Sequence, residues 1–343
     1  MIRPIACVAA VGLATVLLTS VANCGRGGEQ TSPSGTTPTS PGPTLPPGTL
    51  SFTASPIDHD AIRWITPLGN LNPPGHTLPT DHIYFYFANP DAAESPVARR
   101  VPFASPGGGT VFTVLGGVGK ESKVFVRQTA SFSFYLDHLI LTTPLANGST
   151  ITAGQVLGTT GDAFAIDLGV VNEALTLSFV NPARYIPDTL HADGPLKYFS
   201  EPLRGQLYAK VQRLGSDLDG KIDFDRAGRL VGNWFIGSGD ATPLVFTYST
   251  YDPARPLMAL RSGPIQGVFA IAATDPDPAS VTVASGLVLY TLSRSTSGPP
   301  HSAFSTAAYM LVQMTDDTHV RAEMFTAPTI PADFTNAARV FSR

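Results

Sequence analysis

The sequence contains only two cysteines, so disulfide bonds contribute little to its fold. Cys7 lies inside the apolar N-terminal segment, and Cys24 would be the one thiol left in a chain that has lost this segment. No intramolecular disulfide is then possible. Hydrophobic residues make up 43% of the chain, which is enough to form real cores and excludes a disordered protein.

Charged residues are also scarce. They account for 14% of the sequence, the formal net charge is -4, and the five lysines lie far apart. Because no stretch forms a basic patch, we expect no nucleic-acid partner. The sequence also lacks G-x-S-x-G, a glycine-rich phosphate-binding motif and C-x-x-C, so it carries none of these signals for catalysis or nucleotide binding.

Beyond Leu50 no long segment has helical periodicity. Short apolar runs recur between Gly, Pro, Asn and Asp residues, and the 32 glycines and 31 prolines interrupt helices and favour turns. The fold class is therefore predicted to be mainly β. The expected strands are residues 83–87, 110–115, 123–127, 131–135, 163–170, 175–180, 285–292 and 309–314, with a hairpin formed by residues 221–224 and 230–236.

The N-terminus is typical of an export signal, predicted over residues 1–23. Arg3 supplies a positive start, and an apolar core too short for a durable membrane span follows. Val21-Ala22-Asn23-Cys24 resembles a bacterial lipobox, which predicts lipidation of Cys24 and a membrane-anchored protein of the cell envelope. The alternative is cleavage after Ala22 and a secreted or periplasmic protein. Residues 24–49 are mostly Gly, Ser, Thr and Pro, which predicts an extended tether.

The folded part is predicted to consist of two β-rich domains, residues 50–180 and 181–343. The boundary is placed at residues 181–193, where a polar and proline-containing stretch follows the last strand of the first block. The second domain is expected to be a sandwich or barrel-like structure. Residues 331–343 contain Ala, Phe and Arg in a pattern that favours a short terminal helix. Nothing in this second block indicates its role.

Two stretches contain the candidate functional residues. The first, residues 66–82, places His76, Asp81 and His82 close together, directly before an apolar run. Clusters of His and Asp beside a rigid strand are typical of metal sites. The second stretch, residues 135–170, contains His138 and Asp167. We expect the two stretches to face each other across one site.

The second stretch resembles the lysostaphin/LytM-type zinc endopeptidases. Tyr135-Leu136-Asp137-His138-Leu139, Asn147-Gly148, residues 151–158 and Gly161 are similar to the Y-x-H-L, G-x-x-V-x-x-G-Q-x-I-G and G motifs of that family. The first stretch resembles the family's H-x-x-x-D, with His76 at the histidine position. The similarity covers residues 66–170. It implies a LytM-like β-sheet domain, the duplicated hybrid motif fold, over residues 50–180.

The resemblance implies a set of site residues. Zinc would be the cofactor, bound by His76, by either Asp81 or His82, and by Asp167, with His138 as the catalytic base. The sequence departs from the family's H-x-H motif, because Ala165 and Asp167 occupy the two histidine positions. Residues two apart on a strand share a face, so Ala165 and Asp167 are expected to point to the same side.

Two functions follow from this resemblance. The first is a divergent metalloendopeptidase, a hydrolase that cleaves or recognises peptidoglycan peptides or another peptide or glycan of the cell envelope. The second is an inactive pseudopeptidase that acts as a cell-wall binding or scaffold lipoprotein, an interpretation favoured by Ala165 and by the displaced Asp81. Convergence of the candidate side chains within a few ångströms is required for the enzyme.

Overall fold

The structure is a computed structural model that describes residues 50–237, 244–261, 266–296, 298–299, 303–326 and 330–343. The predicted export signal and tether, with Cys24, lie outside these residues. Within the described ranges, no helix is long and apolar enough to cross a membrane.

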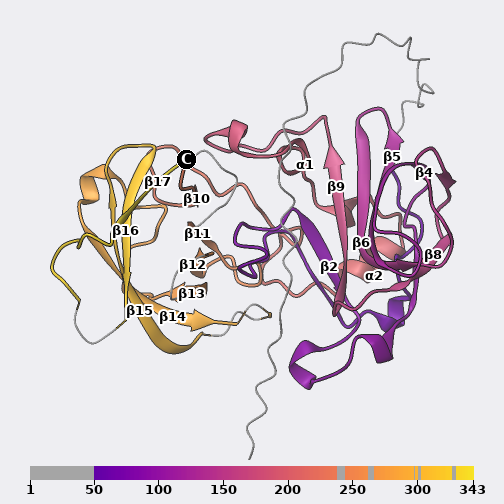
Figure 1. Ribbon diagram of the computed structural model, residues 1–343, viewed down its shortest axis with the longest axis horizontal. Coiled ribbons are helices and arrows are strands. Elements are labelled where there is room, and N and C mark those ends of the chain that lie inside the picture. The colour runs from indigo at the N-terminus through magenta and orange to yellow at the C-terminus, as the bar shows by residue number, and fades with distance from the viewer. Residues whose placement is uncertain (1–49, 238–243, 262–265, 297, 300–302, 327–329) are drawn as a thin grey trace, which may run out of the picture. The chain divides into compact units, whose positions relative to one another are not determined.

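The prediction of a mainly β fold is confirmed, since the described chain forms two antiparallel sheets (Figure 1). The first sheet has the strand order β1-β2-β9-β6-β5-β4-β7; β8 joins it by pairing with β6, and β3 pairs with β8. Its strands are β1 (Trp64–Thr66), β2 (His82–Tyr86), β3 (Pro102–Ala104), β4 (Gly109–Leu115), β5 (Glu121–Thr129), β6 (Phe132–Leu141), β7 (Thr150–Ile151), β8 (Val156–Thr160) and β9 (Ala165–Asn172).

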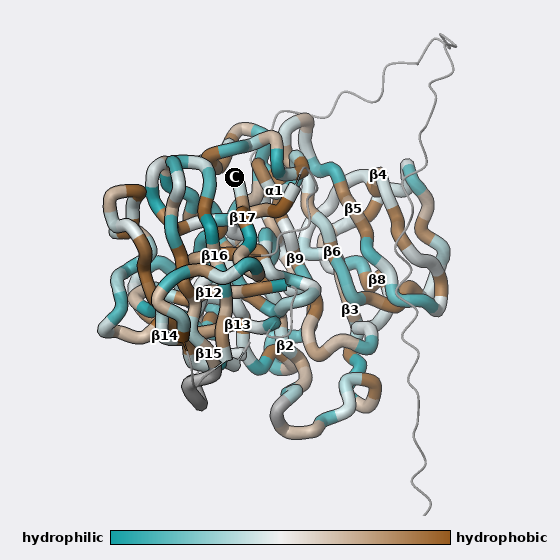
Figure 2. Tube along the Cα trace, turned by 60° about the vertical axis from the view of Figure 1, so that its left-hand side comes forward, coloured by the Kyte–Doolittle hydropathy of each residue, from teal (hydrophilic) through white to brown (hydrophobic). Residues whose placement is uncertain are grey.

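The second sheet runs in chain order from β10 to β17. Every neighbouring pair is antiparallel, and its own hydrophobic cluster includes Trp234, Phe246 and Tyr290. Its strands are β10 (Gly232–Trp234), β11 (Leu244–Tyr248), β12 (Pro256–Leu260), β13 (Gly267–Ile271), β14 (Val288–Ser295), β15 (Ala303–Met314), β16 (His319–Phe325) and β17 (Arg339–Ser342). Figure 2 shows hydrophobic and hydrophilic residues interspersed along the strands, as expected for sheets with one face buried in a core.

In the part of the chain that the structure describes, helices are few and short. The α-helices are α1 (Pro187–Leu190) and α2 (Leu203–Tyr208), and the 3₁₀ helices are η1 (His59–Ala61), η2 (Pro90–Ala92), η3 (Val97–Arg99), η4 (Pro182–Arg184), η5 (Pro195–Tyr198) and η6 (Val283–Ser285). The predicted terminal helix is wrong, because Arg339–Ser342 forms β17 and pairs with β16.

Two strand predictions are also wrong. Residues 175–180 alternate in hydropathy but form no strand, because their N–H groups bond elsewhere: Ser178 N donates to Asp223 and Val180 N to Asp225. Residues 221–224 do not form a hairpin with 230–236. Only Gly232–Trp234 is a strand there, and it pairs with β11.

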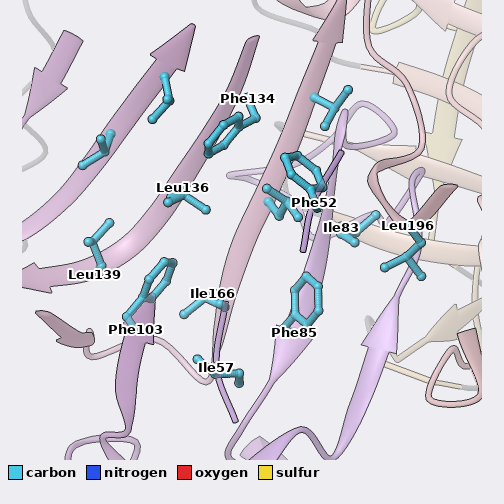
Figure 3. Close-up of a cluster of buried hydrophobic side chains, with 14 of the residues drawn as sticks. Phe52, Ile57, Ile83, Phe85, Phe103, Phe134, Leu136, Leu139, Ile166 and Leu196 are labelled. Carbon is cyan, nitrogen blue, oxygen red and sulfur yellow. The ribbon is translucent and has the colours of Figure 1, made fainter. Parts of the chain in front are cut away.

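Successive side chains of β2, β6 and β9 point to opposite sides of the sheet, so the sheet has one face in the core and one polar face. Ile83, Phe85, Phe134, Leu136 and Ile166 are buried in one hydrophobic cluster (Figure 3). The residues between them project to the opposite side of the sheet. This cluster also contains residues that follow the predicted domain boundary, namely Ala192, Leu196, Phe199, Leu207 and Ile222. The boundary itself stays a prediction.

The segment between β1 and β2 is held by residues of the second half of the chain. The Thr250 hydroxyl donates to the Leu68 carbonyl at 2.7 Å, and the Tyr251 hydroxyl lies 3.2 Å from Thr66 Oγ1 and 3.4 Å from Asn70 Oδ1. Leu71 is fully buried in a cluster with apolar residues of β11, β12 and β13. These contacts fix the course of the loop that leads to His76.

Candidate functional site

The strand register places the candidate residues on the polar face of the first sheet. His82 lies opposite Gly169, Tyr84 opposite Asp167, and Tyr135 opposite Gly169. Because facing residues of an antiparallel pair project to the same side, these side chains share one face. Asp167 points toward His82 and His138.

His82 is the centre of this group. Its side chain is buried, its Nδ1 lies 3.1 Å from Asp81 Oδ1 and from the Tyr135 hydroxyl, and its Nε2 lies 3.0 Å from the Tyr84 hydroxyl and 3.3 Å from Asp167 Oδ2. Burial alone would lower the pKa of His82, but the carboxylates of Asp167 and Asp81 on its two sides raise it above the usual range. The two carboxylates therefore favour the protonated form of the ring, with Asp81 and Tyr135 beside Nδ1 and the Tyr84 hydroxyl as the hydrogen-bond partner of Nε2.

Asp81 uses both of its oxygens. Oδ1 accepts from the Tyr135 hydroxyl at 2.9 Å as well as from His82, and Oδ2 accepts from the Thr189 hydroxyl at 2.7 Å. Burial would raise the pKa of Asp81, but the hydrogen bonds from His82, Thr189 and Tyr135 hold it well below the usual range. Asp81 is an ionised and fully occupied acceptor.

Asp167 joins the two imidazoles. Its Oδ2 lies 3.3 Å from His82 Nε2 and 3.5 Å from His138 Nε2, whereas its Oδ1 is buried and has no hydrogen-bond partner among the described residues. Burial raises the pKa of Asp167 although His82 and His138 favour its ionised form. A half-satisfied buried carboxylate of this kind costs stability and is typical of functional sites.

His138 reaches the site through a bulge in β6. Its φ is 64°, and the register of β5 against β6 shifts here, so that Ser122 faces Leu139 while Val124 faces Leu136. The His138 ring Nδ1 lies 2.7 Å from Glu121 Oε1. Burial would lower the pKa of His138, but Asp167 and Glu121 raise it.

His76 lies at the edge of the group. Its ring packs edge-on against His82, with 5.3 Å between the ring centres, and it also contacts Tyr84. Burial and the neighbouring His82 lower the pKa of His76 to about 4. It is a neutral imidazole at physiological pH. The predicted residues thus form one chain of contacts: His76, His82 with Asp81, Asp167, then His138.

The sequence did not identify several residues that complete the site. Tyr84 and Glu121 contact the histidines but carry no motif. Gly169 is equally necessary, because a Cβ there would lie 2.0 Å from Cζ of Tyr135. Because Gly169 has no Cβ, the Tyr135 ring can lie across β9 and its hydroxyl can reach Asp81. The facing positions of these residues follow from sheet register, which only the fold supplies.

The residues present do not fit a zinc ion in this arrangement. Zinc needs about three free ligand atoms, with imidazole nitrogens unprotonated. Both nitrogens of His82 and both oxygens of Asp81 are engaged, and Ala165 supplies no imidazole. Within the described part of the chain, no group of three or more His, Cys, Asp and Glu side chains is arranged to hold a metal ion. Zinc stays an implication of the family resemblance.

A pocket of about 340 Å³ opens beside this group. Asp81, His82, His76 and Tyr135 line it together with Lys123. The segment of residues 74–80 forms one wall, α1 contributes a second, and Arg261 comes from the second half of the chain. The polar face therefore borders a space large enough for a small ligand or the end of a larger one.

Comparison with known proteins gave no match to any family model or to any curated protein. Solved structures are similar to part of the chain. They include a zinc-containing peptidase from Vibrio cholerae, a putative M23 peptidase from Pseudomonas aeruginosa, and an M23 metalloprotease, pseudoalterin, from the deep sea.

The similarity to these structures is distant. The V. cholerae peptidase is 20% identical, with 36% of this chain and 37% of that chain covered and a TM-score of 0.26. The P. aeruginosa structure is 21% identical, with coverages of 43% and 55% and a TM-score of 0.24. Pseudoalterin is 13% identical, with coverages of 44% and 88% and a TM-score of 0.26. The match thus spans little more than a third of the first structure, and values this low carry no assignment to the family.

Proposed function

We propose that this chain is a cell-envelope protein whose first sheet recognises wall peptides without hydrolysing them. The observation that carries the proposal is the enclosure of His82. Its ring lies between the carboxylates of Asp81 and Asp167, with hydroxyls of Tyr84 and Tyr135 beside it. Both ring nitrogens are thus engaged by neighbouring side chains, which leaves no free lone pair for general-base chemistry on a substrate. Such a network instead makes a rigid, polar floor for the adjacent pocket.

A zinc-dependent peptidase is the second candidate. Each of the two histidines has a carboxylate beside Nδ1, Asp81 for His82 and Glu121 for His138, and both Nε2 atoms point toward Asp167 Oδ2. Metal-binding histidines are commonly oriented by carboxylates in this way. In this candidate, zinc would take the place of the protons that lie between these groups. A peptidase of this kind would contain one equivalent of zinc and would cleave wall peptides.

Export and anchoring belong to the same proposal. The sequence favours lipidation at Cys24 and a tether of residues 24–49 that would hold the folded part away from a membrane, with free secretion as the alternative. In bacteria supplied with a labelled fatty acid, the chain should carry the label and sediment with membranes. Cys24→Ser should lose both properties. Unlabelled chain in the soluble fraction would favour secretion.

Co-sedimentation with purified peptidoglycan tests recognition. The wild-type chain should sediment with the wall material, and Leu78→Trp, which fills the pocket, should reduce the bound fraction at least fivefold. Leu287→Trp adds the same bulk at an exposed position outside the pocket and should bind like wild type. Equal binding by the two variants, or no binding by the wild type, would overturn the proposal.

A further inference from the structure

Two charged side chains in the pocket have no charged or hydrogen-bonding partner among the described residues. Asp188 belongs to the short helix α1, and its side chain is partly buried. Arg261 follows β12 and is exposed. Both line the same pocket of about 340 Å³. An unpaired carboxylate and an unpaired guanidinium facing one space are available for a ligand.

The other charges of the pocket are already neutralised. Lys123 Nζ lies 3.4 Å from Asp137 Oδ2 and 3.9 Å from the centre of the Tyr135 ring, and Asp81 is surrounded by three donors. His76 is uncharged at physiological pH because its pKa is lowered to about 4 by burial and by His82. The free charges of the pocket are therefore Asp188 and Arg261.

These two charges do not neutralise each other. Burial and the nearby carboxylate of Asp81 raise the pKa of Asp188, and Lys123, Arg127 and His191 are the cations that oppose this shift. Among the described residues no ion pair joins Arg261 to Asp188, although both line the pocket. The carboxylate thus lies where a cation from outside would be stabilised. Leu78, Ile186 and Phe125 supply apolar surface in the same pocket.

We propose that the pocket binds a peptide that carries both a free ammonium group and a free carboxylate, with Asp188 binding the ammonium and Arg261 the carboxylate. This inference rests on the proposed function and names the chemical class of its ligand. It also assigns a role to the second half of the chain, which would supply a specificity-determining residue rather than a separate binding domain.

Calorimetric titration of the full chain with three synthetic peptides tests this inference. The first is N-acetyl-Ala-Lys-Ala, which has one ammonium and one carboxylate. The second has an acetylated lysine, and the third has a C-terminal amide. Against the wild type, each modified peptide should bind about tenfold more weakly than the first, as expected for loss of one charge-assisted hydrogen bond.

Two variants test which residue of the pocket binds which charged group of the peptide. Arg261→Gln should lose the preference for the free carboxylate over the amide but keep the preference for the free amine. Asp188→Asn should do the reverse. Arg339→Gln and Asp60→Asn change exposed charges outside the pocket and should bind like wild type.

Each outcome separates this inference from the proposed function. If the wild type does not distinguish the three peptides, or if Arg261→Gln still prefers the carboxylate, the inference is wrong. Binding of peptidoglycan with no affinity for any of the peptides overturns the inference and leaves the proposed function standing. Failure to bind either peptidoglycan or peptides overturns both.

Discussion

At the scale of single residues, the site is a set of carboxylates and hydroxyls arranged around the His82 ring. His82 is enclosed by Asp81 and Asp167, and His138 extends the chain of contacts to Glu121. Buried charges are tolerated when each is paired, so the network is stabilised only while its protonation state is kept. This makes stability depend on pH in a defined direction.

The free energy of unfolding should therefore fall above neutral pH. The pKa values of His82 and His138 are raised above the usual 6.5, so their contribution is complete below pH 6.5 and is lost as the pH rises through the raised values. Asp167→Asn removes a carboxylate that raises both, so the loss should be smaller. Urea unfolding between pH 6 and 9 measures this, with Asp162→Asn as an exposed control. Identical pH slopes in wild type and Asp167→Asn would contradict the account.

Gly169→Ala tests the close approach of Tyr135. The added methyl group would lie 2.0 Å from Cζ of that ring, so the ring must move and its hydrogen bond to Asp81 is lost. We expect a destabilisation of about 2–4 kcal/mol in urea unfolding, from overpacking and the lost hydrogen bond.

Matched variants separate the two causes in Gly169→Ala. Tyr135→Phe removes only the hydroxyl and should cost less. Gly298→Ala places a methyl group where no atom lies within 4 Å and should change stability little. If Gly169→Ala is as stable as wild type, the described packing of Tyr135 is incorrect.

At the scale of elements, sequence patterns predicted the strands that have one buried face. Residues 123–127 alternate in burial and belong to β5, and residues 83–86 of the predicted run 83–87 belong to β2, which is buried over most of its length. The pattern failed at residues 175–180, because side-chain carboxylates of Asp223 and Asp225 take the backbone N–H groups that a neighbouring strand would need. It failed again at the C-terminus, where pairing with β16 overrides local helix propensity.

The site was predictable only in part. His76, Asp81, His82, His138 and Asp167 could be named from motifs, and the structure connects them. Their partners Tyr84 and Glu121, and the pocket residue Arg261, depend on strand register and on contacts distant in sequence. No local pattern contains that information.

Thr250→Val tests how the second half of the chain positions the loop before β2. The variant leaves the buried Leu68 carbonyl without its hydroxyl donor at 2.7 Å, which should cost about 1–3 kcal/mol. Hydrogen exchange should quicken across residues 68–80, which contain His76. Thr315→Val removes a longer bond of 3.4 Å at the surface and serves as the control. Unchanged exchange in the loop would show that this contact does not hold it.

At the scale of the whole molecule, the two sheets have separate hydrophobic clusters but share one pocket. The first sheet supplies the polar floor, and the second half of the chain contributes Arg261 and holds the loop that carries His76. We propose that this pocket is a recognition site because the histidines and carboxylates beside it are paired with one another. The competing candidate is a zinc peptidase whose site would consist of the same residues.

The most direct test combines zinc analysis with digestion of peptidoglycan. The purified chain is incubated with zinc, desalted and analysed for bound metal, and the same preparation is mixed with peptidoglycan to measure released peptides and bound protein. The account predicts retention on peptidoglycan, less than about a tenth of an equivalent of zinc and no release of peptides. One equivalent of zinc, with peptides released by the wild type but not by His138→Ala, would contradict it.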